Sequence, residues 1–251
     1  MQESSNAPAC ARADASLTVA ERARHAAFRV PKRRSDWLIG RLAAKSVVAA
    51  ALANAIPGDW PLRAIEIASD PSGKPYARIA PEVGPVTGLA AGERLPISVS
   101  ISHAEGRALC AAAWSDPGDG SRRTLGVDLG LIEPRSREFV ATFFTEGEQR
   151  FVRDAPPGER DLRTNLIWCA KEAVLKALGL GLTVDTLDLS CLPEAVLADP
   201  AEWPIWPADD AWRSFAATCS PALVPGGGTI RGIWRCFPGF VGALASTTST
   251  A

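Results

Sequence analysis

Two carboxylates and two lysines lie in two short motifs of this sequence. The run Trp-Cys-Ala-Lys-Glu-Ala-Val-Leu-Lys-Ala-Leu-Gly-Leu-Gly at 168–181 contains Lys171, Glu172 and Lys176. Upstream, the run Gly-Val-Asp-Leu-Gly contains Asp128. In proteins Mg²⁺ commonly joins one or two carboxylates to the phosphates of a substrate. These residue types therefore suit a divalent metal ion that holds a phosphate-rich ligand.

The spacing of residues in the motif at 168–181 predicts one helix, over 164–178, that offers both a carboxylate and ammonium groups. At about 100° per residue, Glu172 and Lys176 lie within about 40° of each other, and Lys171 lies nearer the apolar side. The apolar stripe consists of Ile167, Val174 and Leu178. An ordinary ion pair on a solvated face, worth about 0.2–0.5 kcal/mol, is the alternative interpretation of Glu172 and Lys176.

Asp128 ends an apolar strand that we expect over Thr124–Leu129. A carboxylate at the end of a strand can simply cap a turn. It can also join Glu172 as a ligand of a metal ion. Both interpretations stay open on the residues alone.

A second group of candidate residues lies in the N-terminal half. A basic cluster follows the first predicted helix, a lysine lies in a turn, and a Ser-His pair ends a strand: Arg33, Arg34, Arg41, Lys45, Lys74, Ser102 and His103. Arginine suits phosphate because its planar fork binds two oxygens at once. A solvated basic face and a structural histidine are the alternatives. His25, the other histidine, is expected at the surface.

The pattern of elements favours an α+β fold, because strands follow strands without regular βαβ alternation. We expect helices over 18–30, Ser35–Ala53 (capped by Ser35 or Asp36), around 139–144, over 146–153 and over 164–178. We expect strands over Ala64–Ala68, 97–102, 108–114, Thr124–Leu129, Leu187–Leu189, 230–236 and 240–244. The segment 191–228 is left unassigned.

The predicted parts of the chain are a disordered tail at 1–15, an N-terminal lobe at 16–118 and a C-terminal lobe at 119–251, with the boundary between the lobes at the Pro-Gly-Asp-Gly run of 117–120.

Composition narrows the class of protein. The chain has 251 residues, of which 47% are hydrophobic, and a formal net charge of −1. A nearly neutral chain argues against bulk binding of nucleic acid. The first residues lack the apolar core of a signal peptide, and no apolar run approaches the roughly 20 residues that span a bilayer. The cysteines show no metal-ligand spacing, so we expect reduced thiols in a soluble cytoplasmic protein without membrane contact.

The order and spacing of these motifs resemble the 4′-phosphopantetheinyl transferases, in particular the long, two-lobed type that acts on carrier proteins of polyketide and non-ribosomal peptide synthesis. The family pattern Trp-x-x-Lys-Glu-Ala-x-x-Lys-x-x-Gly matches at 168–179, and Ser-His matches at 102–103. The resemblance covers roughly 20–190. It implies a pseudo-dimer of two similar α+β lobes, with coenzyme A in the cleft between them.

The resemblance also implies an enzyme, a holo-[carrier protein] synthase that acts as a monomer. The inferred reaction moves the 4′-phosphopantetheine group of coenzyme A to a serine of an acyl or peptidyl carrier protein and releases adenosine 3′,5′-bisphosphate. Glu172, Lys176 and Asp128 are the implied catalytic residues, and Mg²⁺ is held by Asp128 and Glu172. The implied contacts to coenzyme A come from Arg33, Arg34, Arg41, Lys74, Ser102, His103, Asp128, Lys171 and Lys176.

One position departs from the family pattern. The pattern Gly-[Val/Ile]-Asp-x-Glu ends in a glutamate that is usually a third metal ligand, and here that position is Gly130. Water or Glu133 could take its place. A non-catalytic module that binds coenzyme A or a nucleotide, and a structural protein without a ligand, are therefore kept as alternatives.

Overall fold

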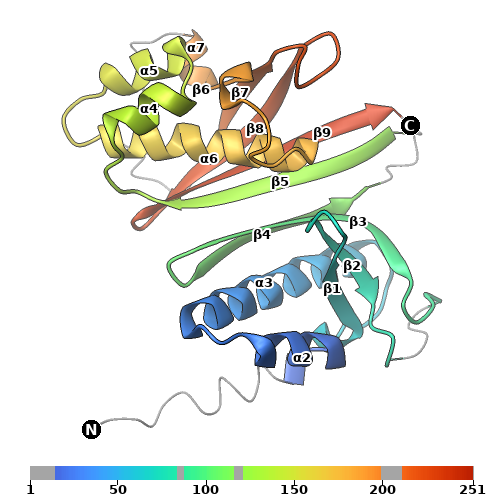
Figure 1. The fold of residues 1–251 in the computed structure, drawn as a ribbon. Helices are drawn as coiled ribbons and strands as arrows, with labels where there is room; N and C mark the ends of the chain where they lie inside the picture. The colour runs from blue at the N-terminus through green and yellow to red at the C-terminus, as the bar shows by residue number, and fades with distance from the viewer. Residues whose placement is uncertain (1–14, 84–87, 116–120, 199–210, 251) are drawn as a thin grey trace, which may run out of the picture. The chain divides into compact units, whose positions relative to one another are not determined.

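The computed structural model describes residues 15–83, 88–115, 121–198 and 211–250 (Figure 1). Contacts divide the chain after Arg123 into two compact units, unit 1 up to Arg123 and unit 2 over Thr124–Ser249. The predicted lobe boundary at 117–120, and residues 1–14 of the predicted tail, lie outside the described residues. Each unit is considered by itself below.

Unit 1 consists of one long helix on an antiparallel sheet. Its elements are α2 (Val19–Ala27), α3 (Pro31–Ala55), the 3₁₀ turn η1 (Leu62–Ala64), β1 (Ile65–Ser69), β2 (Pro75–Ile79), β3 (Arg94–Ala104) and β4 (Arg107–Trp114). The four strands lie in the order β1-β2-β3-β4. Ala44, Val48 and Leu52 of α3 are buried in the core against this sheet. The strands predicted at 97–102 and 108–114 are confirmed as β3 and β4, and Ala104 pairs with Arg107 across the turn between them.

The helix α3 begins earlier than predicted, at Pro31 rather than after a cap at Ser35 or Asp36. Proline is favoured at the first helical position, because its missing N–H needs no partner there and its φ is already helical. Arg33 and Arg34 therefore lie in the first turn of α3 instead of before it. Asp36, which we expected as a possible cap, is buried inside the helix.

The helix α3 bears on the expectation about membranes. By length and composition it is a helix that could cross a bilayer, although we predicted no such segment. In the structure one side of it packs in the core of unit 1. The core helix of a globular unit meets the same criteria of length and hydropathy.

Unit 2 has a larger sheet covered by helices. Its elements are β5 (Ser121–Leu131), α4 (Arg137–Phe143), α5 (Glu146–Arg153), α6 (Arg160–Leu178), the 3₁₀ turn η2 (Thr186–Asp188), β6 (Leu189–Pro193), α7 (Glu194–Ala198), β7 (Arg213–Cys219), β8 (Gly228–Phe237) and β9 (Phe240–Thr250). The five strands lie in the order β5-β9-β8-β7-β6. The strand predicted at Leu187–Leu189 was wrong in its bounds, because η2 occupies most of that segment and β6 begins at Leu189.

The two units repeat one plan. In each, a short helix, a long helix and a 3₁₀ turn precede four strands that lie side by side in chain order. Unit 2 adds β5 beside β9, and the described part of unit 1 has no counterpart of this strand. The predicted α+β class and the two similar lobes are confirmed.

A buried ion pair stands at the same place of the repeat in both units. In unit 2, Glu148 and Thr145 form a capping box at the start of α5. Glu148 Oε2 lies 2.8 Å from Lys171 Nζ of α6, and Glu148 Oε1 accepts a hydrogen bond from the Cys191 amide of β6 at 2.6 Å. One carboxylate therefore joins the short helix, the long helix and the first of the four strands that lie side by side.

Unit 1 uses the same residue types for the same purpose. Glu21 and Thr18 form the capping box of α2. The Glu21 carboxylate pairs with Lys45 of α3 and accepts the Ile67 amide of β1 at 3.0 Å. Lys45 is thus enclosed with its partner, so it fits neither of the two roles that we considered for it, a phosphate-binding cluster and a solvated basic face.

We predict that Lys171→Met destabilises the protein by about 3–5 kcal/mol, because it leaves Glu148 buried without its partner. Urea unfolding at pH 7 measures the loss. The double variant Glu148→Leu/Lys171→Met should lose less than the single one. The matched control is Glu146→Ala on the same helix, whose carboxylate is 90% exposed and pairs with Arg150. It should cost under about 1 kcal/mol. Equal losses at the two sites would contradict the structural role of the buried pair.

Candidate active site

The strand β5 and the helix α6 touch through backbone and small side chains. Gly126, Asp128 and Gly130 share one face of β5, because side chains alternate along a strand. A Cβ atom at Gly126 would overlap the carbonyl oxygen of Ala173, and one at Gly130 would lie 2.7 Å from Cys169 Sγ. The face that carries Asp128 is therefore pressed against α6.

This contact brings three of the predicted residues together. Lys176 Nζ lies 2.7 Å from Asp128 Oδ1 and 4.0 Å from Glu172 Oε2. It also donates a hydrogen bond to the Val127 carbonyl at 3.1 Å. Asp128 is buried, whereas Glu172 and Lys176 are partly exposed. The result is an ammonium group held between two carboxylates at the edge of a packed helix.

The electrostatics of this group favour a proton acceptor. Burial raises the pKa of the Glu172 carboxyl, and the negative charge of Asp128 raises it further, while Lys176 opposes both. A carboxylate with a raised pKa holds a proton more readily at neutral pH. Glu172 is thus suited to take a proton from a hydroxyl group.

The same residues fit a magnesium ion that is shared with a substrate. Asp128 and Glu172 supply two carboxylates, and a cation would relieve the repulsion that raises the pKa of Glu172. Within the described residues, no group of three or more His, Cys, Asp or Glu side chains forms a metal site. This donor set fits Mg²⁺ that takes its other ligands from water and phosphate, rather than a site closed by protein.

Glu133 does not present a free carboxylate. Its Oε1 lies 3.0 Å from Arg135 Nη2, and its backbone oxygen accepts a hydrogen bond from Asn165 Nδ2 at 2.7 Å. Water and Glu133, the two replacements that we considered for the missing acid at Gly130, therefore stay open, and Glu133 would have to leave Arg135 to reach a metal ion.

Lys171 corrects a prediction. We expected its ammonium group to bind phosphate, but its side chain is 0% exposed. Besides Glu148, its Nζ donates to the carbonyl oxygens of Thr186 at 2.7 Å and Leu189 at 2.6 Å. An ammonium group has three donors, and these three acceptors use them all. Lys171 holds the fold together and has no donor left for a ligand.

In unit 1, the start of α3 lies beside the hairpin of β3 and β4. Lys32 Nζ lies 2.5 Å from Glu105 Oε1 of the hairpin turn. Arg33 and Arg34 are exposed in that first helical turn, and His103 is exposed near the end of β3, while Ser102 is buried. These exposed cations and His103 are available to an anionic ligand.

Arg41 is more enclosed than we expected. Its guanidinium stacks on Trp37 at 4.7 Å and donates a hydrogen bond to the Ile67 carbonyl. Burial lowers its pKa. His25, which we predicted at the surface, is buried, and its ring stacks on that of Trp37 with 5.9 Å between the ring centres. It also accepts a hydrogen bond from Arg34 Nε at 3.3 Å.

Lys74 is partly buried in the turn between β1 and β2, near Arg122 and Arg94. Burial lowers its pKa, and the positive charge of Arg122 lowers it further. Neither neighbour was predicted as part of a site, because both lie far from Lys74 in the sequence. These three residues form a second concentration of positive charge; Arg122, at the start of β5, lies before the division at Arg123 and so belongs with unit 1.

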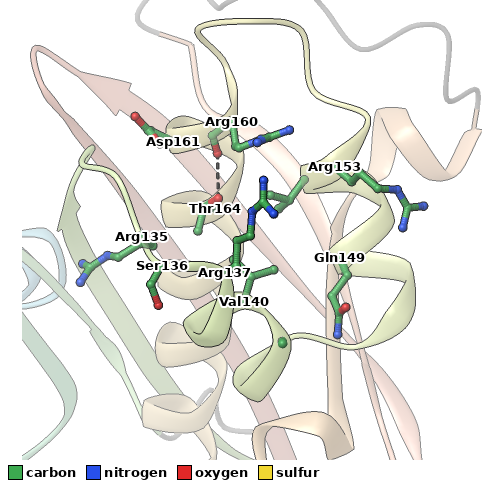
Figure 2. Close-up of a pocket in the computed structure, with 11 residues that line it drawn as sticks. Arg135, Ser136, Arg137, Val140, Gln149, Arg153, Arg160, Asp161 and Thr164 are labelled. Carbon is green, nitrogen blue, oxygen red and sulfur yellow. Dashed lines mark hydrogen bonds between the residues drawn. The ribbon is translucent and has the colours of Figure 1, made fainter.

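A basic pocket of about 590 Å³ lies among α4, α5 and the start of α6 (Figure 2). Its basic lining residues are Arg135, Arg137, Arg153 and Arg160. Val140 and Val152 add apolar surface, and Asp161 adds one carboxylate. Figure 2 shows Arg137 reaching from α4 toward the start of α6, where Arg160 lies. Sequence reasoning missed this pocket, since no single motif contains its residues.

Comparison with known proteins finds a family that part of this chain resembles. Residues 124–216 match the family model of the 4′-phosphopantetheinyl transferase superfamily. The matched segment contains Asp128, Glu172 and Lys176.

Two curated proteins show related sequences. The L-aminoadipate-semialdehyde dehydrogenase-phosphopantetheinyl transferase of Schizosaccharomyces pombe is 25% identical over 132 residues, which are 50% of this chain and 46% of that protein. The holo-[acyl-carrier-protein] synthase of Gloeobacter violaceus is 39% identical over 64 residues, which are 23% of this chain and 48% of that protein. The chain thus spans about half the length of the curated relatives that it matches.

Solved structures of acyl-carrier-protein synthases also align. An apo form named for Chronobacterium ammoiniagenes is 19% identical, with a TM-score of 0.37, and covers 52% of this chain and 99% of its own. A complex with coenzyme A, from Chronobacterium ammoniagenes, is 19% identical, with a TM-score of 0.31, and covers 51% and 98%. These TM-scores are too low to support a structural conclusion.

We predict that Glu172→Gln stabilises the metal-free protein, and more so at pH 7 than at pH 4. Because the folded pKa is raised, the unfolded chain loses this proton at lower pH than the folded one. Wild-type stability therefore falls, relative to the variant, as the pH rises from the ordinary glutamate range through the raised pKa. Urea unfolding at both pH values measures the difference.

A second variant checks the cause. In Asp128→Asn, a pH titration of Glu172 by NMR should show a lower pKa than in the wild type. An equal gain from Glu172→Gln at pH 4 and pH 7 would show that this carboxyl group is not perturbed.

Proposed function

We propose that this protein is an enzyme that transfers the 4′-phosphopantetheine group from coenzyme A to a serine of an acyl or peptidyl carrier protein. The observation that carries the proposal is the contact of Lys176 with Asp128 and Glu172, within the segment that matches the transferase superfamily. The finer parts of the proposal are a carrier of polyketide or non-ribosomal peptide synthesis, and a monomer that works in the cytoplasm.

The chemistry follows from the positions of the charges. Glu172, whose pKa is raised, accepts the proton of the carrier serine, directly or through a water molecule. The serine oxygen then bonds to the phosphorus that carries the pantetheine arm. The bond from that phosphorus to the bridging oxygen of the diphosphate breaks, and adenosine 3′,5′-bisphosphate leaves.

Lys176 and Asp128 act on the phosphate side of this step. The Lys176 ammonium stabilises the negative charge on the phosphoryl oxygens, and Asp128 holds that ammonium in place at 2.7 Å. Asp128 and Glu172 are the residues that would hold Mg²⁺, which when bound neutralises the charge of the diphosphate.

Unit 1 contributes residues for the phosphates of coenzyme A in this proposal. The exposed Arg33, Arg34 and His103 are the best placed, and arginine binds phosphate oxygens in pairs. Arg41 and Ser102 are more enclosed, and Lys74 belongs to a separate basic trio. Arg33 and Arg34 are therefore the first residues of unit 1 to test.

A non-catalytic module that binds coenzyme A is the second candidate. The observation in its favour is Gly130, where the resembling family carries an acid. Binding of coenzyme A alone cannot separate the two candidates, whereas turnover does.

The decisive experiment incubates the protein with coenzyme A, Mg²⁺ and a panel of apo carrier proteins, and reads the carriers by intact mass. We expect a gain of one phosphopantetheine group. Glu172→Gln should lose this transfer, because the proton acceptor is gone, while coenzyme A still binds in a calorimetric titration. Glu146→Gln, at an exposed glutamate of α5, is the matched control and should turn over like the wild type. Binding of coenzyme A without any mass gain would favour the non-catalytic module.

The basic pocket of Figure 2 is our candidate for the surface that receives the carrier protein. We expect the carrier to be a small acidic helical domain, and a pocket with four arginines and one aspartate complements it in charge. Arg137 and Arg160 are both exposed. Their guanidinium groups are therefore accessible to an acidic helix.

We predict that the double variant Arg137→Ala/Arg160→Ala raises the KM for the carrier by about five- to ten-fold, since each exposed contact contributes up to about 1 kcal/mol. The KM for coenzyme A should not change, and the effect should shrink at high salt. Arg231→Ala, at an exposed arginine of β8 paired with Glu194, is the control. A rise in the KM for coenzyme A instead would place these arginines at the nucleotide rather than at the carrier.

A further inference from the structure

Where α6 contacts β5, the side chain of Cys169 fills the space beside Gly130. A Cβ atom added at Gly130 would lie 2.7 Å from Cys169 Sγ. Real Cβ atoms essentially never come this close to a neighbour, so any side chain at position 130 would have to displace the sulfur. Gly130 shares the strand face of Asp128, and Cys169 lies one turn before Glu172 and Ala173 on α6. The crowded place is therefore inside the candidate active site.

The sulfur has little room to move. Cys169 is fully buried, and its thiol has two acceptors beside it, the Val241 carbonyl oxygen at 3.6 Å and the Asp128 carboxylate. A cysteine side chain ends at this sulfur, and on a helix it has few rotamers. An added side chain at position 130 would press on a packed core, where overpacking destabilises.

We propose that Cys169 is the residue that keeps a third carboxylate out of this site, so that position 130 must be glycine and the site works with two protein carboxylates. The inference rests on the proposed function in one respect, the metal ion held by Asp128 and Glu172. In this chain Cys169 is a positioning residue: it touches Asp128 and fills the space from which a carboxylate at 130 would reach the same ion. Gly130 then follows from packing and does not mark a degenerate enzyme.

A cycle of variants tests the packing. Gly130→Glu alone should lower the Tm of the metal-free protein by roughly 3–10 °C. The same substitution in a Cys169→Ala background should lower it by less than half as much, because the sulfur is gone. Equal losses in the two backgrounds would overturn the steric part of the proposal.

Metal binding tests the consequence for the site. Mn²⁺ serves as the probe, because free Mn²⁺ is counted directly by its electron paramagnetic resonance signal. The double variant Gly130→Glu/Cys169→Ala should bind Mn²⁺ about ten-fold more tightly than Cys169→Ala, since affinity rises with the number of charged ligands. The matched control Gly130→Gln/Cys169→Ala has the same shape without the charge and should show no such gain. Equal affinities for the Glu and Gln double variants would overturn the assignment of position 130 to the metal.

The failure of the proposed function can be told apart from the failure of this inference. If the wild type binds Mn²⁺ no more tightly than Asp128→Asn, the proposed metal site is wrong. The Tm cycle needs no metal, and it then decides by itself whether Cys169 excludes a side chain from position 130.

Discussion

The site depends on one constraint, the direct contact of the α6 backbone with β5. A side chain at Gly126 would overlap the Ala173 carbonyl, so glycine is required for the helix to lie this close. Thr124 Oγ1 reinforces the contact by donating a hydrogen bond to the Ala177 carbonyl at 2.7 Å. Only at this separation can Lys176 reach Asp128 on the same strand face. Asp128 points toward α6 because side chains alternate along β5, and Glu172 and Lys176 point toward β5 because they lie one helical turn apart. These three charged residues therefore lie together.

A second constraint fixes the helices that carry the charges. In each unit a glutamate of a capping box pairs with a buried lysine of the long helix. It also accepts a hydrogen bond from a backbone amide of the first of the four strands. Buried charges are costly unless they are paired and hydrogen-bonded, so this arrangement specifies how the elements meet as well as stabilising them. The sequence signature is short, an apolar residue followed by Thr-x-x-Glu, at Leu17–Glu21 and at Phe144–Glu148.

Local rules predicted much of the fold, and long-range partners account for the errors. The α5 bounds came out as predicted, because its cap and charge pattern lie within the segment itself. Asp128, Glu172 and Lys176 were also found from spacing. Lys171 was misassigned, because the helical wheel places a lysine at the edge of an apolar stripe but does not reveal a glutamate on another helix. The four-arginine pocket was missed for a related reason, since three helices build it.

The repeat duplicates the scaffold without duplicating the chemistry. Lys45 of α3 and Lys171 of α6 make equivalent buried pairs, yet Lys45 is followed by Ser46 and Lys171 by Glu172. Neighbouring residues on a helix point about 100° apart, so one can face the core while the next faces β5. The structural lysine and the chemical glutamate therefore do not compete for space. Because unit 2 adds β5 with Asp128 on the side that Glu172 faces, the long helix could keep its packing while its other face acquired a reactive pair.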